Sequence, residues 1–248
     1  MSPRLAFAID AALKGGKSTL GLFQTGAEVL TKSDATPVTI ADQNAERLIR
    51  SLITQNYPDD AILGEEEGGD TGAFDRWVID PIDGTKSFIC GVPLYATLLS
   101  YEVDGETEIG VCYLPALDEM FYAEKGKGAF LNGRPIGVSS RESSKGCILC
   151  CGGSMLKSPH WPRISKLVDN ALASRTWCDA YGHTLVACGR ADAMVDPIVN
   201  HWDISAVSLI VREAGGRFTD LKGGEKLSSE GLSTNGKIHE EVLRALNS

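Results

Sequence analysis

The apolar residues of this chain recur with helical spacing in some segments and form strand-like runs in others. The order in which these segments follow one another differs between its two halves. Near the N-terminus the apolar residues recur with helical periodicity over residues 3 to about 25, where Gly15-Gly16 interrupts the pattern and is expected to bend the helix. A second helical pattern runs from Thr39, a predicted N-cap, to Ile53 and ends before Pro58. The first half is therefore predicted to open with two amphipathic helices.

The rest of the first half has the pattern of short strands joined by tight turns. Runs of β-branched and aromatic residues are bounded by Gly, Asn and Asp, which favour turns. The predicted strands are residues 61–63, 77–79, 93–101, 109–114 and 119–123. The last three follow one another closely enough to form an antiparallel meander.

The second half alternates between strands and helices. Strands are predicted at residues 146–153, 175–180, 193–196 and 217–221, and helices at about 160–173, at 181–190 and at 203–214. Gly215-Gly216 is a typical end for the last helix. We expect a layered fold of the α+β or α/β class, in which halves of about 1–137 and 138–248 fold as one unit.

One stretch, residues 77–88, combines a strand end with groups suited to binding a cation and a phosphate. Asp80 and Asp83 flank a proline, which fixes φ and prevents a regular helix, so the two carboxylates lie on a stiff turn. Gly84 permits a positive φ or the close approach of a ligand. Thr85 could cap a helix whose free N–H groups attract anions. A hard divalent cation together with a phosphate ester requires such a set of groups.

An isolated Asp-x-x-Asp is more often an ordinary turn, so the surrounding carboxylates decide the interpretation. Glu65 follows a predicted strand, where α/β sites gather, although three adjacent glutamates can equally form a solvated loop. Asp203 repeats the pattern of a carboxylate that opens an apolar helix. Asp42 lies in the first turn of its helix, where the helix dipole favours a negative charge, and the residues alone leave open whether it has a further role.

These motifs together resemble the inositol monophosphatase family of Mg²⁺-dependent phosphatases. The resemblance is carried by Asp80-Pro81-Ile82-Asp83-Gly84-Thr85, by Gly64-Glu65-Glu66 before it, and by Trp202-Asp203 and Gly215-Gly216 after it. The motifs occur in the family's order and spacing over roughly residues 30 to 220. The resemblance implies alternating αβαβα layers, a single catalytic domain with its site at the junction of the halves, a homodimer and inhibition by lithium.

The resemblance also implies roles for individual residues. Two or three Mg²⁺ ions would be held by Glu65, Asp80, Asp83, Asp203 and the backbone carbonyl of Ile82. Thr85, with Glu65 or Asp42, would orient the attacking water. The N–H groups of Gly84 and Thr85 would hold the phosphate oxygens. Lys32, in the segment that contains Thr36, Thr39 and Asp42, would line the site.

The residues expected to contact the alcohol of the substrate differ from those of inositol phosphatases. That branch has small residues at the first of two positions and one acidic residue at the second, whereas this chain has Asp179 and Asp196. Two carboxylates suit a substrate that carries a cation. The segments around them resemble the histidinol-phosphatase branch, which acts in histidine biosynthesis. Asp196 is shorter than the glutamate more usual there, and Tyr181-Gly182-His183 also departs from that branch.

Several alternatives stay open at this point. Asp179 could merely cap the helix that follows it. The chain could be a histidinol-phosphate phosphatase, or an inositol-1-phosphate or broad sugar-phosphate phosphatase with the same chemistry. It could also be a non-catalytic cation-binding relative, which is disfavoured because every candidate metal carboxylate and Thr85 are present.

Charge and cysteine content limit the expected partners and the cellular location of the protein. The formal net charge is −9 and no basic stripe is visible, so nucleic acid and anionic membranes are poor partners. A small phosphate monoester could approach only if cations invert the field of the carboxylates. No export signal or membrane-spanning stretch is evident, and the seven cysteines are expected to be reduced thiols in the cytoplasm. The apolar segment from Cys147 to Cys151 lacks a second ligand pair at zinc spacing, so we expect a buried strand.

Overall fold

The computed structural model describes residues 1–26, 28–31, 37–152 and 158–247. Its helices are α1 (Pro3–Thr19), α2 (Ile40–Asn56), α3 (Thr85–Ile89), α4 (Trp161–Asn170), α5 (Asp179–Ala187), α6 (His201–Glu213) and α7 (His239–Asn247). Its strands in the first half are β1 (Val29–Thr31), β2 (Pro37–Thr39), β3 (Ala61–Gly64), β4 (Gly68–Gly69), β5 (Arg76–Asp83), β6 (Ala96–Val103), β7 (Glu106–Leu114), β8 (Glu119–Glu124), β9 (Ala129–Leu131) and β10 (Arg134–Pro135). The second half adds β11 (Ile148–Cys151), β12 (Ala173–Arg175), β13 (Ala193–Asp196), β14 (Arg217–Thr219) and β15 (Gly231–Thr234).

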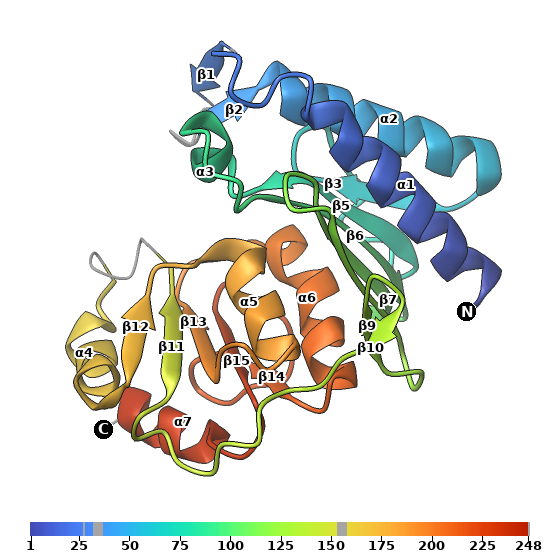
Figure 1. The fold of residues 1–248 in the computed structure, drawn as a ribbon. Helices are drawn as coiled ribbons and strands as arrows, with labels where there is room; N and C mark the ends of the chain where they lie inside the picture. The colour runs from blue at the N-terminus through green and yellow to red at the C-terminus, as the bar shows by residue number, and fades with distance from the viewer. Residues whose placement is uncertain (27, 32–36, 153–157, 248) are drawn as a thin grey trace.

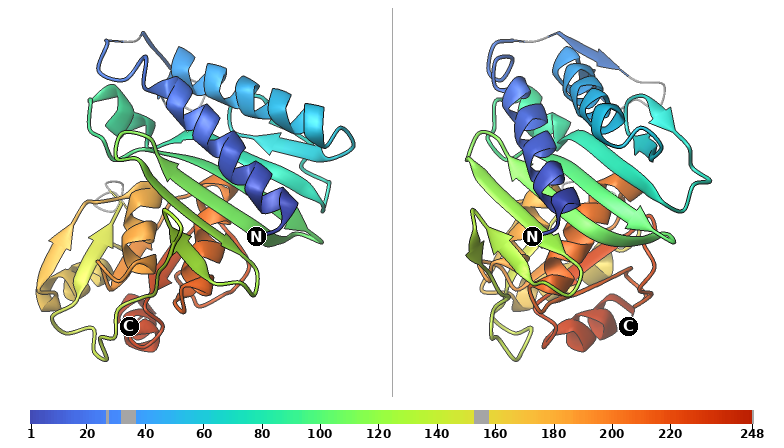
Figure 2. Two further views of the ribbon diagram at one scale, coloured as in Figure 1. Left: turned by 45° about the vertical axis from the view of Figure 1, so that its right-hand side comes forward. Right: turned by 90° about the vertical axis from the view of Figure 1, so that its right-hand side faces the viewer.

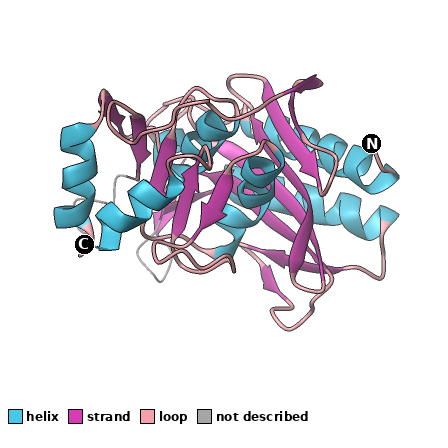
Figure 3. Ribbon diagram, turned by 90° about the horizontal axis from the view of Figure 1, so that it is seen from below, coloured by secondary structure: helices cyan, strands magenta, loops and turns pink. Residues whose placement is uncertain are grey.

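These elements form five alternating layers (Figure 1), which confirms the predicted αβαβα arrangement. Helices α1 and α2 lie side by side across one face of a large sheet (Figure 2). Helices α5 and α6 separate that sheet from a smaller one, whose outer face is covered by α4 and α7. Figure 3 views the layers from below, with helices between and outside the sheets.

The large sheet has strand order β10-β9-β8-β7-β6-β5-β3-β4 and is antiparallel except where β3 pairs with β5. Both of its faces are apolar. On neighbouring strands, Leu99 and Val111 pack toward α1 and α2, whereas Leu98 and Cys112 pack toward α6. Successive side chains of a strand point to opposite faces, so one strand serves two cores. This is why its strands read as nearly continuous apolar runs.

The small sheet has strand order β12-β11-β13-β15-β14 and is mixed. Strands β12, β11 and β13 are parallel, and β15 and β14 are antiparallel to their neighbours. The segment Cys147–Cys151 is buried in this sheet, as expected, and all seven cysteines are free thiols. None of the described helices is long and apolar enough to cross a bilayer.

The first helix differs from the prediction. It ends at Thr19, not near residue 25, and it continues through Gly15-Gly16 without interruption. A Cβ atom at Gly15 would lie 2.6 Å from Ile49 Cδ1, and one at Gly16 would lie 2.6 Å from Tyr113 Cδ1. The two glycines therefore let α1 approach α2 and β7 closely, which a helical-periodicity argument does not reveal.

The predicted strand at 175–180 was wrong. Strand β12 ends at Arg175, and α5 begins at Asp179 instead of residue 181. The apolar residues of this segment suggested a strand, but Ala180 donates its N–H to Asp83 and the chain turns into a helix there. Strands β1, β2, β4, β9, β10 and β15 and helix α7 were not predicted.

Other local predictions are confirmed. Thr39 caps α2, and Asp42 closes a capping box by accepting from the Thr39 N–H. Helix α6 ends before Gly215, which has φ +86°. These features depend on short-range backbone chemistry, which the sequence contains.

Gly110 on β7 sets the distance between the large sheet and α6. A Cβ atom there would lie 2.4 Å from the carbonyl oxygen of Ala206. We expect Gly110→Ala to lower the free energy of unfolding by about 1–3 kcal/mol, because backbone atoms must move apart. Calorimetry should show a reduced Tm, whereas the control Gly21→Ala, with nothing within 4 Å of its Cβ, should be near wild type. Equal Tm values for both variants would contradict this packing role.

Candidate active site

A β-bulge at the end of β5 positions the two aspartates of the central motif, so the expected stiff turn after residue 79 was wrong: the strand continues to Asp83. Asp80 pairs with Leu98 and Asp83 with Ala96, so one extra residue lies on β5 between them. Pro81 occupies this irregular stretch, where its missing N–H breaks no ladder hydrogen bond. Both carboxylates are buried and both line the same cavity.

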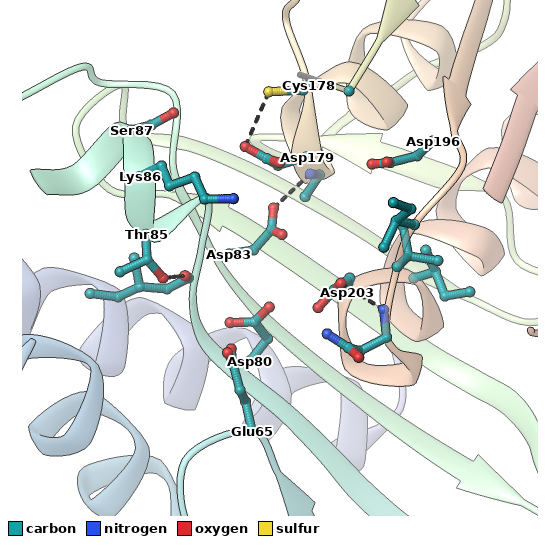
Figure 4. A pocket seen from close by; sticks show the side chains of 18 of the residues that line it. Glu65, Asp80, Asp83, Thr85, Lys86, Ser87, Cys178, Asp179, Asp196 and Asp203 are labelled. Atoms are coloured by element: carbon teal, nitrogen blue, oxygen red, sulfur yellow. Dashed lines mark hydrogen bonds between the residues drawn. The ribbon is translucent and has the colours of Figure 1, made fainter. Parts of the chain in front are cut away.

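Helix α6 brings a third carboxylate to the cluster from far along the chain. Asp203 lies in its first turn, where its Oδ2 accepts from the N–H of Asn200 at 2.8 Å. The carboxylate oxygens of Asp80, Asp83 and Asp203 come within 4.8 Å of one another. Figure 4 shows these side chains converging from β5 and α6.

The segment after β3 adds Glu65 to the same cavity. Its neighbours are held by Glu46 of α2, which is fully buried and accepts from the N–H groups of Glu66 and Glu67 at 2.8 and 3.0 Å. Gly64 is required beside it, because a Cβ there would lie 2.2 Å from Glu46 Oε1. The backbone that follows this predicted strand is therefore held by Glu46 of α2. The three glutamates do not form an unanchored solvated loop.

Thr85 and Asp42 meet beside the motif. The Thr85 hydroxyl lies 3.0 Å from the Ile82 carbonyl oxygen and 3.3 Å from Asp42 Oδ1. Asp42 thus combines its capping role with a contact to Thr85. The predicted N-cap was wrong by one residue: Gly84, with φ +82°, is the N-cap of α3 and Thr85 is its first residue. The positive φ expected of Gly84 is confirmed.

Asp179 and Asp196 line the same cavity as the cluster. Asp179 has φ +58°, a left-handed conformation that Asp tolerates better than most residues. Cys178 is the N-cap of α5 and Asp179 is its first helical residue, with Oδ2 accepting from the Cys178 thiol at 3.3 Å. The alternative that Asp179 is the capping residue of this helix is therefore wrong. Asp196 ends β13 and is buried.

The cavity has a volume of about 540 Å³, within the range of small-molecule sites. It brings together the expected residues Glu65, Asp80, Ile82, Asp83, Gly84, Thr85, Asp179, Asp196 and Asp203. Asp42 is not in its wall but contacts Thr85, which is. Lys32 lies outside the described residues.

Sequence reasoning missed Lys86, Cys178 and Asn200, which also line the cavity. The Lys86 side chain extends toward Asp83 and Asp179 (Figure 4). Its signal in the sequence was a cation directly after Gly84-Thr85. Cys178 and Asn200 carried no comparable signal, because their neighbours in the cavity are distant in the chain.

Burial and mutual repulsion disfavour the ionised carboxylates. Burial, followed by the charges of Glu65, Asp83 and Asp203, raises the pKa of Asp80 well above its ordinary value. Burial, then Asp179 and Asp203, does the same to the pKa of Asp83. Burial also raises the pKa of Asp179, although the Cys178 hydrogen bond and Lys86 oppose it. Without cations, this cluster is electrostatically unfavourable.

The donor set fits a hard divalent cation. Asp80 Oδ1 is buried and has no hydrogen-bond partner among the described residues, so one acceptor in the cluster has no protein donor. Carboxylate and carbonyl oxygens are the ligands that Mg²⁺ prefers. A divalent cation bound among these carboxylates would supply the missing partner of Asp80 Oδ1 and offset their repulsion.

A model of the inositol monophosphatase family matches residues 1–248. The chain belongs to the inositol monophosphatase family. It is 43% identical to a histidinol-phosphatase of Chlorobaculum parvum, over 99% of this chain and 97% of that protein. It is 39% identical to a fructose-1,6-bisphosphatase/inositol-1-monophosphatase of Thermotoga maritima, over 85% of this chain and 82% of that protein. The predicted membership, and the likeness to the histidinol-phosphatase branch, are confirmed.

The fold agrees with solved members of the family. The structure of a Thermotoga maritima IMPase superimposes with a TM-score of 0.91 at 35% identity, covering 99% of this chain and 97% of that one. A small phosphate ester is consistent with this family.

The acidic cluster should make stability depend on pH and on Mg²⁺. A carboxyl whose pKa is raised by folding stabilises the folded state below its ordinary pKa of 3.8, and this stabilisation is lost as pH rises through the raised value. We therefore expect Mg²⁺ to raise Tm more at about pH 8 than at about pH 5, because the ion replaces protons. Scanning calorimetry in EDTA and in Mg²⁺ would measure this. Identical Tm values with and without Mg²⁺ at pH 8, at matched ionic strength, would count against a cation site.

Proposed function

We propose that this protein is a Mg²⁺-dependent phosphomonoesterase that hydrolyses histidinol phosphate to histidinol and phosphate. The observation that supports it is the presence in one cavity of the cluster of Asp80, Asp83 and Asp203 together with Asp179 and Asp196. The first group suits a phosphate accompanied by cations. The second suits an alcohol that carries a positive charge.

The metal-holding residues in this proposal are Glu65, Asp80, Asp83, Asp203 and the carbonyl of Ile82, for two or three ions. Bound Mg²⁺ would neutralise the phosphate and lower the pKa of a coordinated water. The N–H groups of Gly84 and Thr85 would hold phosphate oxygens, aided by the nearby Lys86 ammonium. The family resemblance also implies a substrate-binding role for Lys32, which lies outside the described residues.

Thr85 has the contacts needed to orient a water. Its hydroxyl oxygen lies within hydrogen-bonding distance of two acceptors, the Ile82 carbonyl and Asp42, and its single hydrogen is donated to one of them at a time. The hydroxyl lone pairs are then left to accept a hydrogen from water, which turns a water lone pair toward the phosphorus. Glu65 or Asp42 would receive the proton, and burial already raises the pKa of Asp42.

Two candidate phosphatase activities differ in the alcohol part of the substrate. A histidinol-phosphatase at 43% identity supports histidinol phosphate, and Asp179 and Asp196 would bind its ammonium and imidazole. An inositol or sugar phosphatase is the second candidate, supported by the Thermotoga maritima relative at 39% identity. A non-catalytic relative is disfavoured, because the complete set of acidic side chains and Thr85 face one cavity or its edge.

The remaining features of this proposal follow from the family. Glu65 to Thr85 come from the first half and Asp179 to Asp203 from the second, so residues 1–248 would act as a single catalytic domain. We also propose a homodimer, a cytoplasmic location and sensitivity to lithium, which would compete for one of the Mg²⁺ positions.

Replacing Asp83 tests the metal chemistry. Asp83→Asn should reduce kcat on the order of 10³-fold or more, because an amide neither balances the ion's charge nor holds its water equally well. The fold should survive, since one repelling charge is removed. Steady-state kinetics in saturating Mg²⁺ would measure the loss, with exposed Asp59→Asn as the control. A variant that keeps more than about a tenth of wild-type kcat would remove Asp83 from the metal ligands.

Replacing Asp179 tests the substrate. Asp179→Asn should lower kcat/KM for histidinol phosphate roughly ten- to hundred-fold, since a charge-assisted hydrogen bond is worth ~1.5–3 kcal/mol. Asn also tolerates the left-handed backbone at this position, so the substitution isolates the charge. The loss should appear in KM at least as much as in kcat.

Glycerol phosphate, which lacks a cation, is the matched control substrate and should be hydrolysed nearly as before. Asp196→Asn should act in the same direction as Asp179→Asn. Equal losses on both substrates, or a wild-type preference for inositol-1-phosphate, would favour the second candidate activity instead.

A further inference from the structure

Outside the cavity, a fully buried carboxylate joins the large sheet to the first turn of α6. Glu102, on β6, accepts from His201 Nε2 at 2.6 Å and from the Ser205 hydroxyl at 2.8 Å, both through Oε1. Its Oε2 accepts from Arg76 Nε at 2.9 Å. Burial raises the pKa of Glu102, but these hydrogen bonds and charges outweigh it, so the net shift is downward. The side chain is therefore an anion that only accepts.

The two α6 contacts lie on either side of Asp203. His201 precedes it by two residues and Ser205 follows it by two. Because Glu102 accepts, the 2.6 Å contact requires His201 Nε2 to carry its hydrogen and donate it, and Arg76 Nη2, 3.3 Å from the same nitrogen, then finds no acceptor there. Ser205 is held further by the hydroxyls of Ser100 and Thr107, at 2.7 and 3.1 Å. The sheet thus fixes this helical turn by directional bonds as well as by apolar packing.

Stability alone does not account for this arrangement. Burying an ion pair carries a desolvation cost that its attraction often fails to exceed, and apolar side chains could hold α6 on the sheet. Hydrogen bonds, in contrast, fix how a helical turn is rotated about the helix axis and where it lies relative to the sheet. Asp203 uses Oδ2 for the Asn200 N–H, so the position of its carboxylate in the cluster depends on how that turn is held. Binding groups need placement to within about 0.5 Å.

We propose that Glu102 is a positioning residue for Asp203, which holds the carboxylate of Asp203 in the geometry that binds a divalent cation. This inference rests on the proposed function, in which Asp203 is a metal ligand. Arg76 has a supporting part, because it balances the charge of Glu102 and also donates to the carbonyl of Thr71.

The test is the affinity of the full chain for Mg²⁺ without substrate, measured by isothermal titration calorimetry. Glu102→Gln should raise the Kd roughly 10- to 100-fold, the range for partners that orient metal ligands. Ser205→Ala, which removes one of the bonds to Glu102, should raise it several-fold. Ser208→Ala is the matched control on the same helix, because within the described part of the chain this buried hydroxyl donates to the Ser205 carbonyl and makes no hydrogen bond to Glu102. Its Kd should equal that of the wild type.

Asp203→Asn separates the two levels of the proposal. If it weakens Mg²⁺ binding while folded Glu102→Gln and Ser205→Ala both keep Kd within about twofold of wild type, Glu102 is only structural and the inference fails. If Asp203→Asn leaves Kd unchanged, the metal role in the proposed function fails and this inference fails with it. If Glu102→Gln does not fold, the comparison of Ser205→Ala with Ser208→Ala decides.

Discussion

Repulsion among six carboxylates that face one cavity is the main electrostatic constraint on this site. They are Glu65, Asp80, Asp83, Asp179, Asp196 and Asp203. Left to themselves, such groups would separate or take up protons, as the raised pKa values of Asp80 and Asp83 indicate. The fold holds them together by covering them on several sides and by fixing most of them through backbone or side-chain hydrogen bonds. Because the fold holds these carboxylates together against their repulsion, the cavity favours the binding of cations.

The elements around the cavity offset part of this negative charge. Helices α5 and α6 both begin at its wall, and helix N-termini carry partial positive charge. The N–H of Ala180 donates to Asp83, and that of Asn200 donates to Asp203. These two hydrogen bonds favour the ionised forms of Asp83 and Asp203, and each of them uses one carboxylate oxygen. The layered fold is what points the ends of two helices at the end of one strand.

Two buried glutamates hold the segments that carry carboxylates of this site. Glu46 on α2 holds the segment that carries Glu65, and Glu102 on β6 holds the turn that carries Asp203. Each is hydrogen-bonded to an arginine, Arg50 or Arg76, which balances its charge. Residues that face the cavity are thus supported by a second set of charges that does not face it. Lys86 has a different place, beside Asp179, where its ammonium would be close to any substrate cation.

Features that arise within short segments could be predicted from the residues alone. The positive φ of Gly84, the N-cap of α2 and the end of α6 depend on local backbone chemistry, and the ordered motifs were enough to indicate the family. The turn expected at Asp80–Asp83 is instead a β-bulge within strand β5. Tertiary structure decided the rest. Asp179 was assigned to a strand because its neighbours are apolar, whereas it is the first residue of α5, next to Ala180, whose N–H donates to Asp83. Lys86, Cys178 and Glu102 gained their surroundings from strands and helices up to about a hundred residues away. Pairings over such distances are fixed by the packing of whole layers, which local periodicity does not encode.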